Sequence, residues 1–257
     1  MKKQMMMALV SLMTLSAQAQ ANFEVSVSNP SKSAKTDAPV VIDLSKLGSI
    51  GAIQRAVVKV DGKEIPSQLD DTNCDCTNDE LCFLVDLGKK ETKTYQVQLY
   101  QEGEQVQYPA RTFAELCLPS KNKKLAKNKQ DIYLRSISFD KKTKDVYHYV
   151  HSHGVCFESE LVAMRVYFDN RQTIDLYGKI NKGLVVYDTQ FYPSEEQLQA
   201  GSGDDCLWVG NTYGLGALRG WDGKNQLHLN DVKSQEPRVI SEGTLRAMVE
   251  GGASGGV

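Results

Sequence analysis

The sequence predicts an all-β protein built as a β-sandwich, and three observations support this prediction. Short runs rich in β-branched and aromatic residues recur at close intervals along the chain. Many of these runs alternate apolar and polar residues, which is the period of a half-buried strand. Polar turn residues such as Asp61-Gly62 separate the runs, and only one short stretch predicts a helix. Short strands with polar connections are typical of a sandwich.

Residues 1–21 have the three parts of a secretory signal peptide. Lys2 and Lys3 form the basic start, an apolar run follows, and small residues end at Ala19 or Ala21, where a signal peptidase cleaves. The apolar run is too short to span a bilayer, so we expect no membrane anchor after cleavage. The leader predicts a periplasmic or secreted protein.

The charge of the chain argues against nucleic acid as a partner. Loss of Lys2 and Lys3 with the leader reduces the 30 basic residues to 28 against 32 acidic ones, which is a formal charge of −4. A nucleic-acid-binding protein usually carries a basic stripe. An oligosaccharide or polysaccharide stays open as a partner, because a few local arginines and lysines are enough to bind it.

The strand pattern divides the rest of the chain into four parts. Residues 22–100 predict a small amino-terminal β-sandwich portion with strands at 23–27, 40–44, 56–60, 81–85 and 94–99. Residues 101–130 are polar and rich in lysine, which favours a linker or surface excursion, although 108–119 equally suits a crossing between sheets. Residues 131–250 predict the core of a larger β domain, and the glycine-rich residues 251–257 predict a flexible tail.

A loop at residues 71–79 spaces oxygen-bearing side chains at alternate positions, as a calcium loop does. The side chains that would bind the ion are Asp71, Asn73, Asp75 and Asp79. Cys76 stands where such a loop has glycine, and the twelfth position holds Cys82 instead of glutamate. Structural calcium is therefore one interpretation and a plain polar turn is the other. No other cofactor is expected.

The chain has six cysteines, an even number that allows pairing in an oxidising compartment. They are Cys74, Cys76, Cys82, Cys117, Cys156 and Cys206. Their spacing matches no zinc pattern. Cys82 and Cys206 lie inside apolar runs, so we expect these two to be buried free thiols.

Acid and base side chains are densest between residues 148 and 179, where His148, His151 and His153 precede two expected strands. The first strand is predicted over 158–168, a turn over 169–172 and a second strand over 173–177, which together make a hairpin. Alternation along the first strand would place Glu158 and Glu160 on one face and Arg165 on the other. Asp175, Tyr177 and Lys179 share one face of the second strand.

A short helix is predicted over 193–201. Ser194 and Gln197 have the spacing of a capping box, and Gly201 ends the helix after about two turns. A loop rich in glycine and aspartate follows the helix, and a strand is expected to resume near Trp208. Loops of this composition often lie at functional rims.

The chain resembles the domain of unknown function family 4861 over most of its length after the leader. The resemblance rests on residues 62–71, 79–87, 151–179, 189–193, 203–210 and 216–223. Members of that family are exported proteins of Gram-negative polysaccharide degraders, found with enzymes that process pectin and uronates. The resemblance implies a galactose-mutarotase-like β-supersandwich, a fold shared by sugar epimerases and polysaccharide lyases. Members continue well beyond the end of this sequence, which implies that carboxy-terminal strands are missing here.

The first functional hypothesis is a carbohydrate-active enzyme, and a uronate lyase is its first form. A lyase needs a base for the proton beside the carboxylate, a cation for the carboxylate and an acid for the leaving oxygen. His153 or Tyr177 would be the base or the acid, and Arg165 or Lys179 would neutralise the carboxylate. The structural alternative for the histidines is an exposed position near a turn.

Two other reactions use the same region of the chain. In an epimerase-like reaction Glu158 would be the base and His153 the acid. In a glycosidase, Glu158 and Glu160 would form the carboxylate pair, since residues two apart share a face of a strand. The structural alternative is that these carboxylates form salt bridges with Arg165 or Arg171 at the end of a strand.

The second hypothesis is a non-catalytic glycan-binding protein of the cell envelope. Trp208, Tyr213 and Trp221 would stack on sugar rings, with core packing as the alternative for each tryptophan. Three aspartates would hydrogen-bond sugar hydroxyls, namely Asp175, Asp204 and Asp205. A third hypothesis is a truncated, inactive family member. Convergence of His153, Glu158 and Arg165 in one cleft would favour the enzyme, whereas aligned aromatic residues would favour binding.

Overall fold

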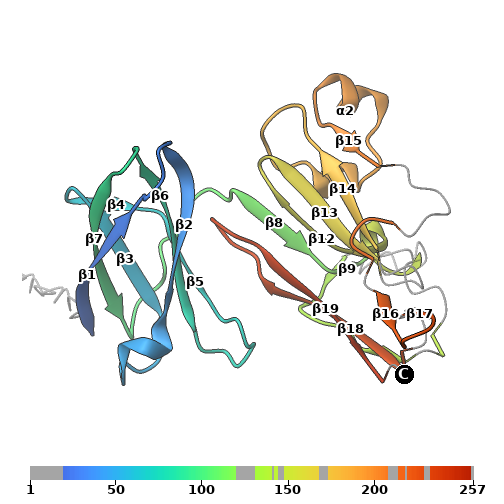
Figure 1. Ribbon diagram of the computed structural model, residues 1–257, viewed down its shortest axis with the longest axis horizontal. Helices are drawn as coiled ribbons and strands as arrows, with labels where there is room; N and C mark the ends of the chain where they lie inside the picture. The colour runs from blue at the N-terminus through green and yellow to red at the C-terminus, as the bar shows by residue number, and fades with distance from the viewer. Residues whose placement is uncertain are drawn as a thin grey trace, which may run out of the picture.

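The computed structural model is all-β with two short helices, as the sequence predicts. It describes residues 20–119, 131–140, 142–143, 148–167, 173–207, 214–217, 219–228 and 232–255. The strands form two lobes, with β1 to β7 in the amino-terminal lobe and β8 to β19 in the carboxy-terminal lobe (Figure 1). No helix in these described ranges is long and apolar enough to cross a membrane.

The amino-terminal lobe is a sandwich of two antiparallel sheets. The first sheet has the order β1 (Ala21–Ser28), β7 (Thr92–Tyr100), β3 (Arg55–Val60) and β4 (Lys63–Ile65). The second sheet has the order β2 (Lys35–Asp43), β6 (Glu80–Leu87) and β5 (Ser67–Asp70), and the short 3-10 helix η1 (Leu44–Leu47) follows β2. The core between the sheets includes Val58 and Val97 from the first sheet and Leu81 and Phe83 from the second.

The five strands predicted in this lobe are confirmed, and in β1 and β7 the alternation along the sequence matches the burial. In β7, for example, Tyr95, Val97 and Leu99 are buried while the residues between them are more exposed. The predicted turn at Asp61-Gly62 joins β3 to β4, and both residues have positive φ, 52° and 75°. Two positive φ angles define the hairpin turn that Asp-Gly favours.

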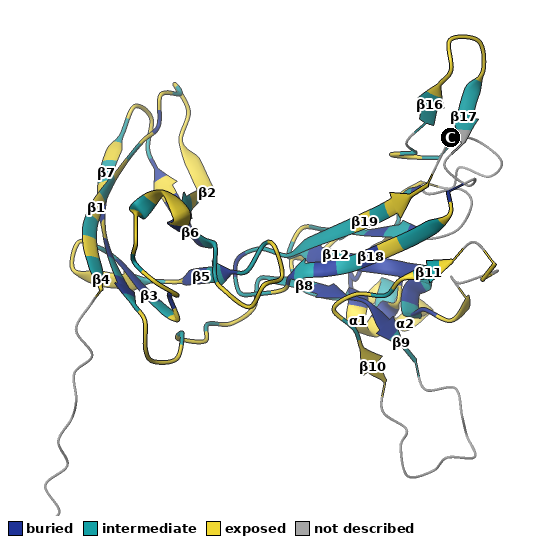
Figure 2. Ribbon diagram, turned by 90° about the horizontal axis from the view of Figure 1, so that it is seen from below, coloured by how far each residue is buried: buried dark blue, intermediate teal, exposed yellow. Residues whose placement is uncertain are grey.

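The carboxy-terminal lobe also pairs two main sheets. Its five-stranded sheet has the order β15 (Asp204–Asp205), β14 (Ile174–Gly178), β13 (Val162–Tyr167), β12 (Gly154–Ser159) and β8 (Thr112–Glu115). The three-stranded sheet has the order β11 (Phe139–Asp140), β18 (Ser234–Ser241) and β19 (Met248–Ser254). Val155 and Val166 from the first sheet pack with Val239 and Val249 from the second. Figure 2 shows dark blue buried segments in β8 and β12, whereas β19 is mostly intermediate.

Smaller elements complete this lobe. Two short ladders pair β9 (Cys117–Leu118) with β10 (Ile132–Tyr133), and β16 (Arg219–Trp221) with β17 (Gln226–His228). A one-turn 3-10 helix, η3 (His151–His153), leads into β12. Two short helices follow β14, namely α1 (Val186–Thr189) and α2 (Glu195–Gln199). The predicted helix is confirmed as α2, with the complete capping box of Ser194 and Gln197.

The predicted long strand over 158–168 is wrong. The chain turns at Glu160-Leu161, so residues 154–159 and 162–167 are two antiparallel strands, with Glu158 opposite Ala163. The hydroxyl of Ser159 stabilises the turn by accepting a hydrogen bond from the amide of Leu161. Glu158 therefore lies on the same face of the sheet as Arg165, and it does not share a face with Glu160 in the way that the sequence predicted.

Two other predictions need correction. The segment 101–130 is not a linker throughout, because Thr112–Glu115 forms β8 of the five-stranded sheet and Cys117–Leu118 forms β9. This agrees with the alternative of a crossing between sheets at 108–119. The predicted tail at 251–257 begins as a strand, since β19 reaches Ser254 and pairs with β18. Main-chain hydrogen bonds hold such a strand without large side chains.

Polar side chains join the two lobes. Gln68 of β5 donates to the main-chain oxygen of Arg246 at 3.0 Å, and the Arg246 guanidinium bonds Asp70 at 2.7 Å. A second contact runs through Arg111, whose guanidinium bonds Asp37 in one lobe and Glu160 in the other, at 2.7 Å each. The junction between the lobes is therefore held by directional polar contacts.

Candidate functional site

A row of polar side chains crosses one face of the five-stranded sheet. Strand register places Glu115 of β8, Cys156 of β12, Arg165 of β13 and Asp175 of β14 next to one another. The opposite face of the same sheet is apolar and packs on the three-stranded sheet. Burying polar groups is unfavourable unless each has a hydrogen-bond partner. A cluster of buried ionisable groups that is kept despite this cost is a candidate functional site.

Arg165 is the centre of this row, and its side chain is only 2% exposed. Its Nε donates to Asp175 at 2.7 Å, and one Nη donates to the main-chain oxygen of Ser152 at 3.3 Å. The other Nη donates to the hydroxyls of Tyr167 at 2.7 Å and Tyr192 at 3.2 Å. The guanidinium is too buried and too fully partnered to touch a substrate. It can act on one only through Tyr192, which makes it a positioning residue.

Tyr192 and His153 form the open edge of the cluster. Tyr192 is 61% exposed, although its hydroxyl reaches inward to Arg165. Its ring centroid lies 5.9 Å from that of His153, and His153 in turn lies 6.4 Å from His148. An imidazole is the group that general acid–base catalysis uses most often, and a phenol also serves in this role. The predicted residues His153 and Arg165 thus come together, and Tyr192, which sequence reasoning missed, lies between them.

The backbone on both sides of Arg165 is held in an unusual conformation. Ser152 and His153 have φ of 54° and 61°, and Gln190 and Phe191 have φ of 52° and 64°. Non-glycine residues in this left-handed region cost of order 1–3 kcal/mol each and cluster at functional sites. Arg165 touches both turns, because it bonds the carbonyl of Ser152 and lies 4.6 Å over the ring of Phe191.

Glu158 and Lys179, two predicted catalytic residues, form a buried ion pair instead. Their side chains are 0% and 1% exposed. Glu158 also accepts the amides of Val185 and Val186 at 3.0 Å each, so it holds the segment that starts α1. The Lys179 ammonium donates to Glu158 and to the carbonyls of Ser159 and Gly183, which uses all three of its protons. Neither charge is available to a substrate.

Glu160 and Tyr177 are also occupied. Glu160 lies in the turn and bonds Arg111 at the junction of the lobes, whereas Glu158 bonds Lys179, so the two carboxylates do not form a pair across a substrate. Tyr177 is fully buried, donates its hydroxyl to the carbonyl of Gly203 at 2.7 Å and packs edge-on against Phe191. Its position beside Phe191 is that of a core residue.

Of the predicted sugar-binding residues that the structure describes, the aspartates lie near one another, whereas Trp221 lies apart on another ladder. Asp175 is bonded to Arg165, whereas Asp204 and Asp205 lie on the edge strand β15. Burial raises the pKa of the Asp205 carboxyl, and the nearby charge of Asp175 adds to the effect. Trp221 is 66% exposed on the separate β16–β17 ladder. Trp208 and Tyr213 fall outside the described residues.

The predicted calcium loop uses its oxygens for its own backbone. Asp79 accepts hydrogen bonds from the amides of Thr72 and Asn73, and Asp71 accepts from the amides of Asp75 and Cys76. These contacts are those of a tight polar turn, in which the carboxylates cap amides. Calcium binding by this loop therefore gains no support from its geometry and stays a prediction.

All six cysteines are free, and Cys206 differs from its prediction. Cys82 is buried as expected, and burial raises the pKa of its thiol to about 11. Cys206 is exposed, because the strand expected around it is limited to Asp204–Asp205. Cys156 is buried in the polar row, and burial raises the pKa of its thiol well above the usual value.

A second group of side chains lies at the Glu115 end of the row. Nδ1 of His151 and Oε1 of Glu115 are 2.5 Å apart, and this hydrogen bond raises the pKa of His151 against the opposing effect of burial. Burial raises the pKa of the Cys117 thiol to about 11. Ligand atoms of Glu115, Cys117 and His151 all lie within 4.8 Å of one another. Among the described residues, this is the one group of three or more His, Cys, Asp or Glu side chains whose ligand atoms come this close to one another.

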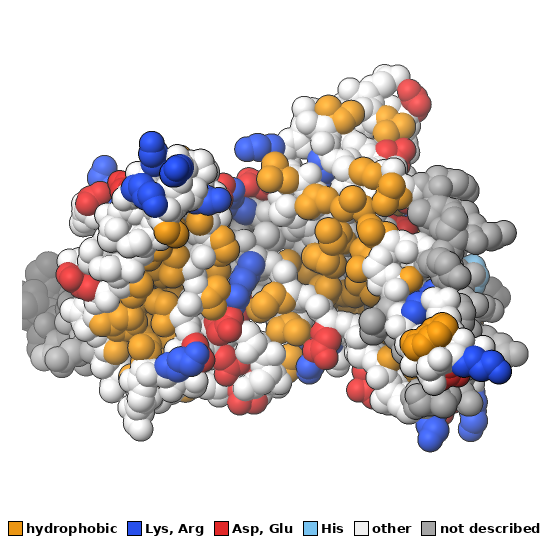
Figure 3. All heavy atoms as spheres, viewed as in Figure 1, with side chains coloured by type: hydrophobic (Ala, Val, Ile, Leu, Met, Phe, Trp, Pro, Cys, Tyr) orange, Lys and Arg blue, Asp and Glu red, His pale blue; other side chains and the backbone are white. Residues whose placement is uncertain are grey.

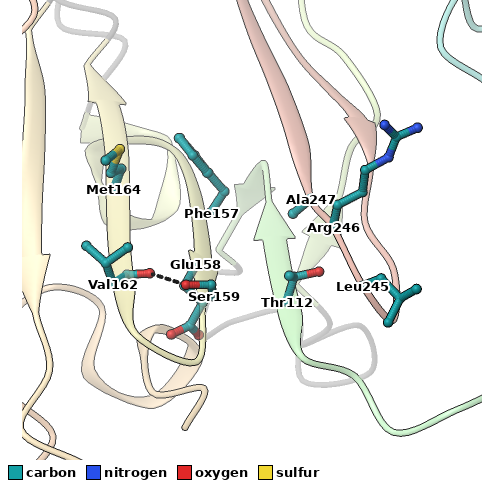
Figure 4. A pocket seen from close by; sticks show the side chains of 9 residues that line it. All are labelled: Thr112, Phe157, Glu158, Ser159, Val162, Met164, Leu245, Arg246 and Ala247. Carbon is teal, nitrogen blue, oxygen red and sulfur yellow. Dashed lines mark hydrogen bonds between the residues drawn. The ribbon is translucent and has the colours of Figure 1, made fainter. Parts of the chain in front are cut away.

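The opposite face of the sheet carries a groove between the two sheets of this lobe. Its walls are mostly apolar, with Phe157, Val162 and Met164 on one side and Leu245 and Ala247 on the other (Figure 4). In Figure 4 the carboxylate of Glu158 points away from this groove, toward the polar face. Figure 3 shows hydrophobic side chains gathered in this hollow of the carboxy-terminal lobe. The groove offers packing surface and no acid–base pair.

One comparison with known proteins gives a match. A family model described as a domain of unknown function, DUF4861, matches residues 27–252. No curated protein and no solved structure matches the chain. The matched range includes both lobes and the whole cluster around Arg165.

Proposed function

The chain belongs to the DUF4861 family, and from that premise we propose that it is an exported carbohydrate-active protein that cleaves uronate-containing polysaccharides of the pectin type. The leader pattern of residues 1–21 supports export to the periplasm or beyond. The carbohydrate context and a galactose-mutarotase-like supersandwich are what the family resemblance implies. The packed antiparallel sheets of both lobes are consistent with such a fold.

One observation favours a lyase over the other reactions. The exposed Tyr192 has its hydroxyl bonded to a buried arginine and its ring beside His153. An epimerase based on Glu158 would need a carboxylate that is instead committed to Lys179 and two amides. A glycosidase based on Glu158 and Glu160 would need two free carboxylates, which are here bonded to Lys179 and to Arg111. Tyr192 and His153 place a phenol beside an imidazole, and Tyr192 is exposed at the edge of the cluster.

The proposed step is a β-elimination in which Arg165 acts only through Tyr192, because neither its charge nor that of Lys179 reaches the uronate carboxylate. Tyr192, whose oxygen accepts a hydrogen bond from Arg165, removes as the phenolate the proton on the carbon beside the uronate carboxylate. A carbon–carbon double bond forms as the bond to the glycosidic oxygen breaks. His153 supplies the proton that this leaving oxygen takes up. The product is a sugar with an unsaturated, ultraviolet-absorbing uronate.

The test is the absorbance of unsaturated product formed from a panel of uronate oligosaccharides. Tyr192→Phe removes only the hydroxyl, and His153→Asn keeps a residue that tolerates the left-handed backbone at this position. We expect each to lower the rate by about 10² or more, which is the usual contribution of an acid–base group. Tyr149→Phe, at a similarly exposed tyrosine, should have no effect. Full activity of Tyr192→Phe would refute the assignment.

A binding role without catalysis is the second candidate, and exposed Trp221 is the observation that favours it. A large aromatic ring in solvent is a ready surface for a sugar face. If the protein binds these oligosaccharides but forms no unsaturated product, and if Trp221→Ala abolishes binding, the binding role replaces the lyase.

A further inference from the structure

Three side chains from two distant parts of the sequence converge beside the polar row. Glu115 ends β8 and Cys117 begins β9, so the two residues alternate along one extended stretch. His151 opens η3, the turn that leads into β12, and β12 pairs with β8. Pairing of β8 with β12 therefore places the imidazole against the Glu115 carboxylate.

The Glu115 carboxylate is buried, and only one of its two oxygens has a hydrogen-bond partner among the described residues. Its side chain is 1% exposed. Oε1 contacts His151 at 2.5 Å and the Cys156 thiol at 3.5 Å, whereas Oε2 has no hydrogen-bond partner in the described part of the chain. A buried carboxylate oxygen without a partner is unfavourable, and a cation is one group that satisfies it.

We propose that Glu115, Cys117 and His151 bind a zinc-class divalent transition metal. The three ligand atoms lie within 4.8 Å of one another, and ligand atoms around tetrahedral zinc lie roughly 3.3–3.7 Å apart, so small side-chain rotations complete the set. A thiolate, an imidazole and one carboxylate form a mixed donor set that suits zinc and cobalt. Calcium and magnesium take oxygen ligands and do not suit it.

Binding exchanges a proton for the metal. The Cys117 thiol loses its proton to solvent as its sulfur bonds the ion, since only the thiolate is a metal ligand. Gln190 hydrogen-bonds His151 and would hold the imidazole as an outer partner of the site. His151 and His153 share the η3 turn, so the metal would also fix the turn that carries His153.

The test is a titration of the full chain, stripped of metal by a chelator, with Co²⁺ under reducing conditions. We expect one equivalent to bind with the intense near-ultraviolet band of a cobalt–thiolate bond. Zn²⁺ should then displace the cobalt and remove the band. These readouts do not depend on catalysis, so failure of the lyase proposal would leave this result unaffected. A wild-type chain that gives no thiolate band would overturn the site.

Substitutions identify the ligands. Cys117→Ser should abolish the thiolate band. Glu115→Gln should weaken cobalt binding by at least about 10-fold, because loss of even an outer partner of a metal ligand has an effect of that size. Far-ultraviolet circular dichroism checks that each variant is folded. Cys82→Ser, at a buried thiol in the other lobe, should keep the band. Loss of the band when the exposed thiols are replaced by serine, with Cys117 intact, would overturn the proposal. Those thiols are Cys74, Cys76 and Cys206.

Discussion

Replacement of Lys179 by methionine is the sharpest test of whether the Glu158–Lys179 pair is structural. Both side chains are almost fully buried, so the substitution leaves the Glu158 charge without its cation. It also removes the donor from the carbonyls of Ser159 and Gly183. Breaking a buried ion pair by removing one partner costs about 3–5 kcal/mol. The amides of Val185 and Val186 still stabilise Glu158, so we expect about 3 kcal/mol, the lower end of that range.

Urea unfolding followed by circular dichroism measures the free energy, and hydrogen exchange across residues 183–190 reports the local effect. The double variant Glu158→Gln, Lys179→Met should be more stable than Lys179→Met alone, because it no longer buries a lone charge. Lys182→Met, at an exposed lysine three residues on, is the matched control and should be nearly neutral. A Lys179→Met variant that is as stable as the wild type but inactive would refute the structural role and return Lys179 to the catalytic candidates.

Three further predictions follow from the geometry. Burial raises the pKa of Asp205, so ionisation of its carboxyl destabilises the fold. This destabilisation is absent below the ordinary aspartate pKa of 3.8 and develops as the pH rises through the folded pKa. Asp205→Asn should therefore raise the melting temperature at pH 7 and make no difference at about pH 3.5; a stabilisation that is equal at both pH values would contradict this. Ser194→Ala removes the capping box of α2 and should cost about 1 kcal/mol, seen as faster hydrogen exchange at 195–199 only. Arg246→Met leaves the buried Asp70 without its cation and should cost about 3 kcal/mol of unfolding free energy, whereas Arg238→Met, at a half-exposed pair, should cost less than about 1 kcal/mol.

Sequence reasoning succeeded where a local pattern decides the structure. Strands β1 and β7 of the amino-terminal lobe alternate in sequence and in burial, and the Asp61-Gly62 turn and the Ser194 cap are local chemistry. It failed at Glu160-Leu161, because this tight turn contains no glycine, proline or asparagine and the alternation continues through it. One missed turn was enough to place Glu158 on the wrong face of the sheet.

The candidate site was only partly predictable for a related reason. Arg165 and His153 were recognised by residue type, but Tyr192 follows a helix of one turn that no periodicity reveals. Its best sequence indication is that it lies in the 189–193 segment that carries the family resemblance. Glu115 and His151 meet only through the register of β8 with β12, so no spacing along the sequence predicts their contact. Buried partners such as Lys179 for Glu158 depend equally on tertiary contacts.

The polar face of the five-stranded sheet has a consequence for the order of folding. The strands β12, β13 and β14 follow one another in sequence and can pair early, because short loops close at little entropic cost. Burial of their polar face is unfavourable until its side chains have hydrogen-bond partners. Glu158 gains them when the amides of Val185 and Val186 arrive, and Arg165 gains one when Tyr192 arrives. We expect the apolar face to collapse first and the segment around α1 to dock last. The groups proposed for catalysis would then be the last part of this lobe to form and the first to be lost on heating.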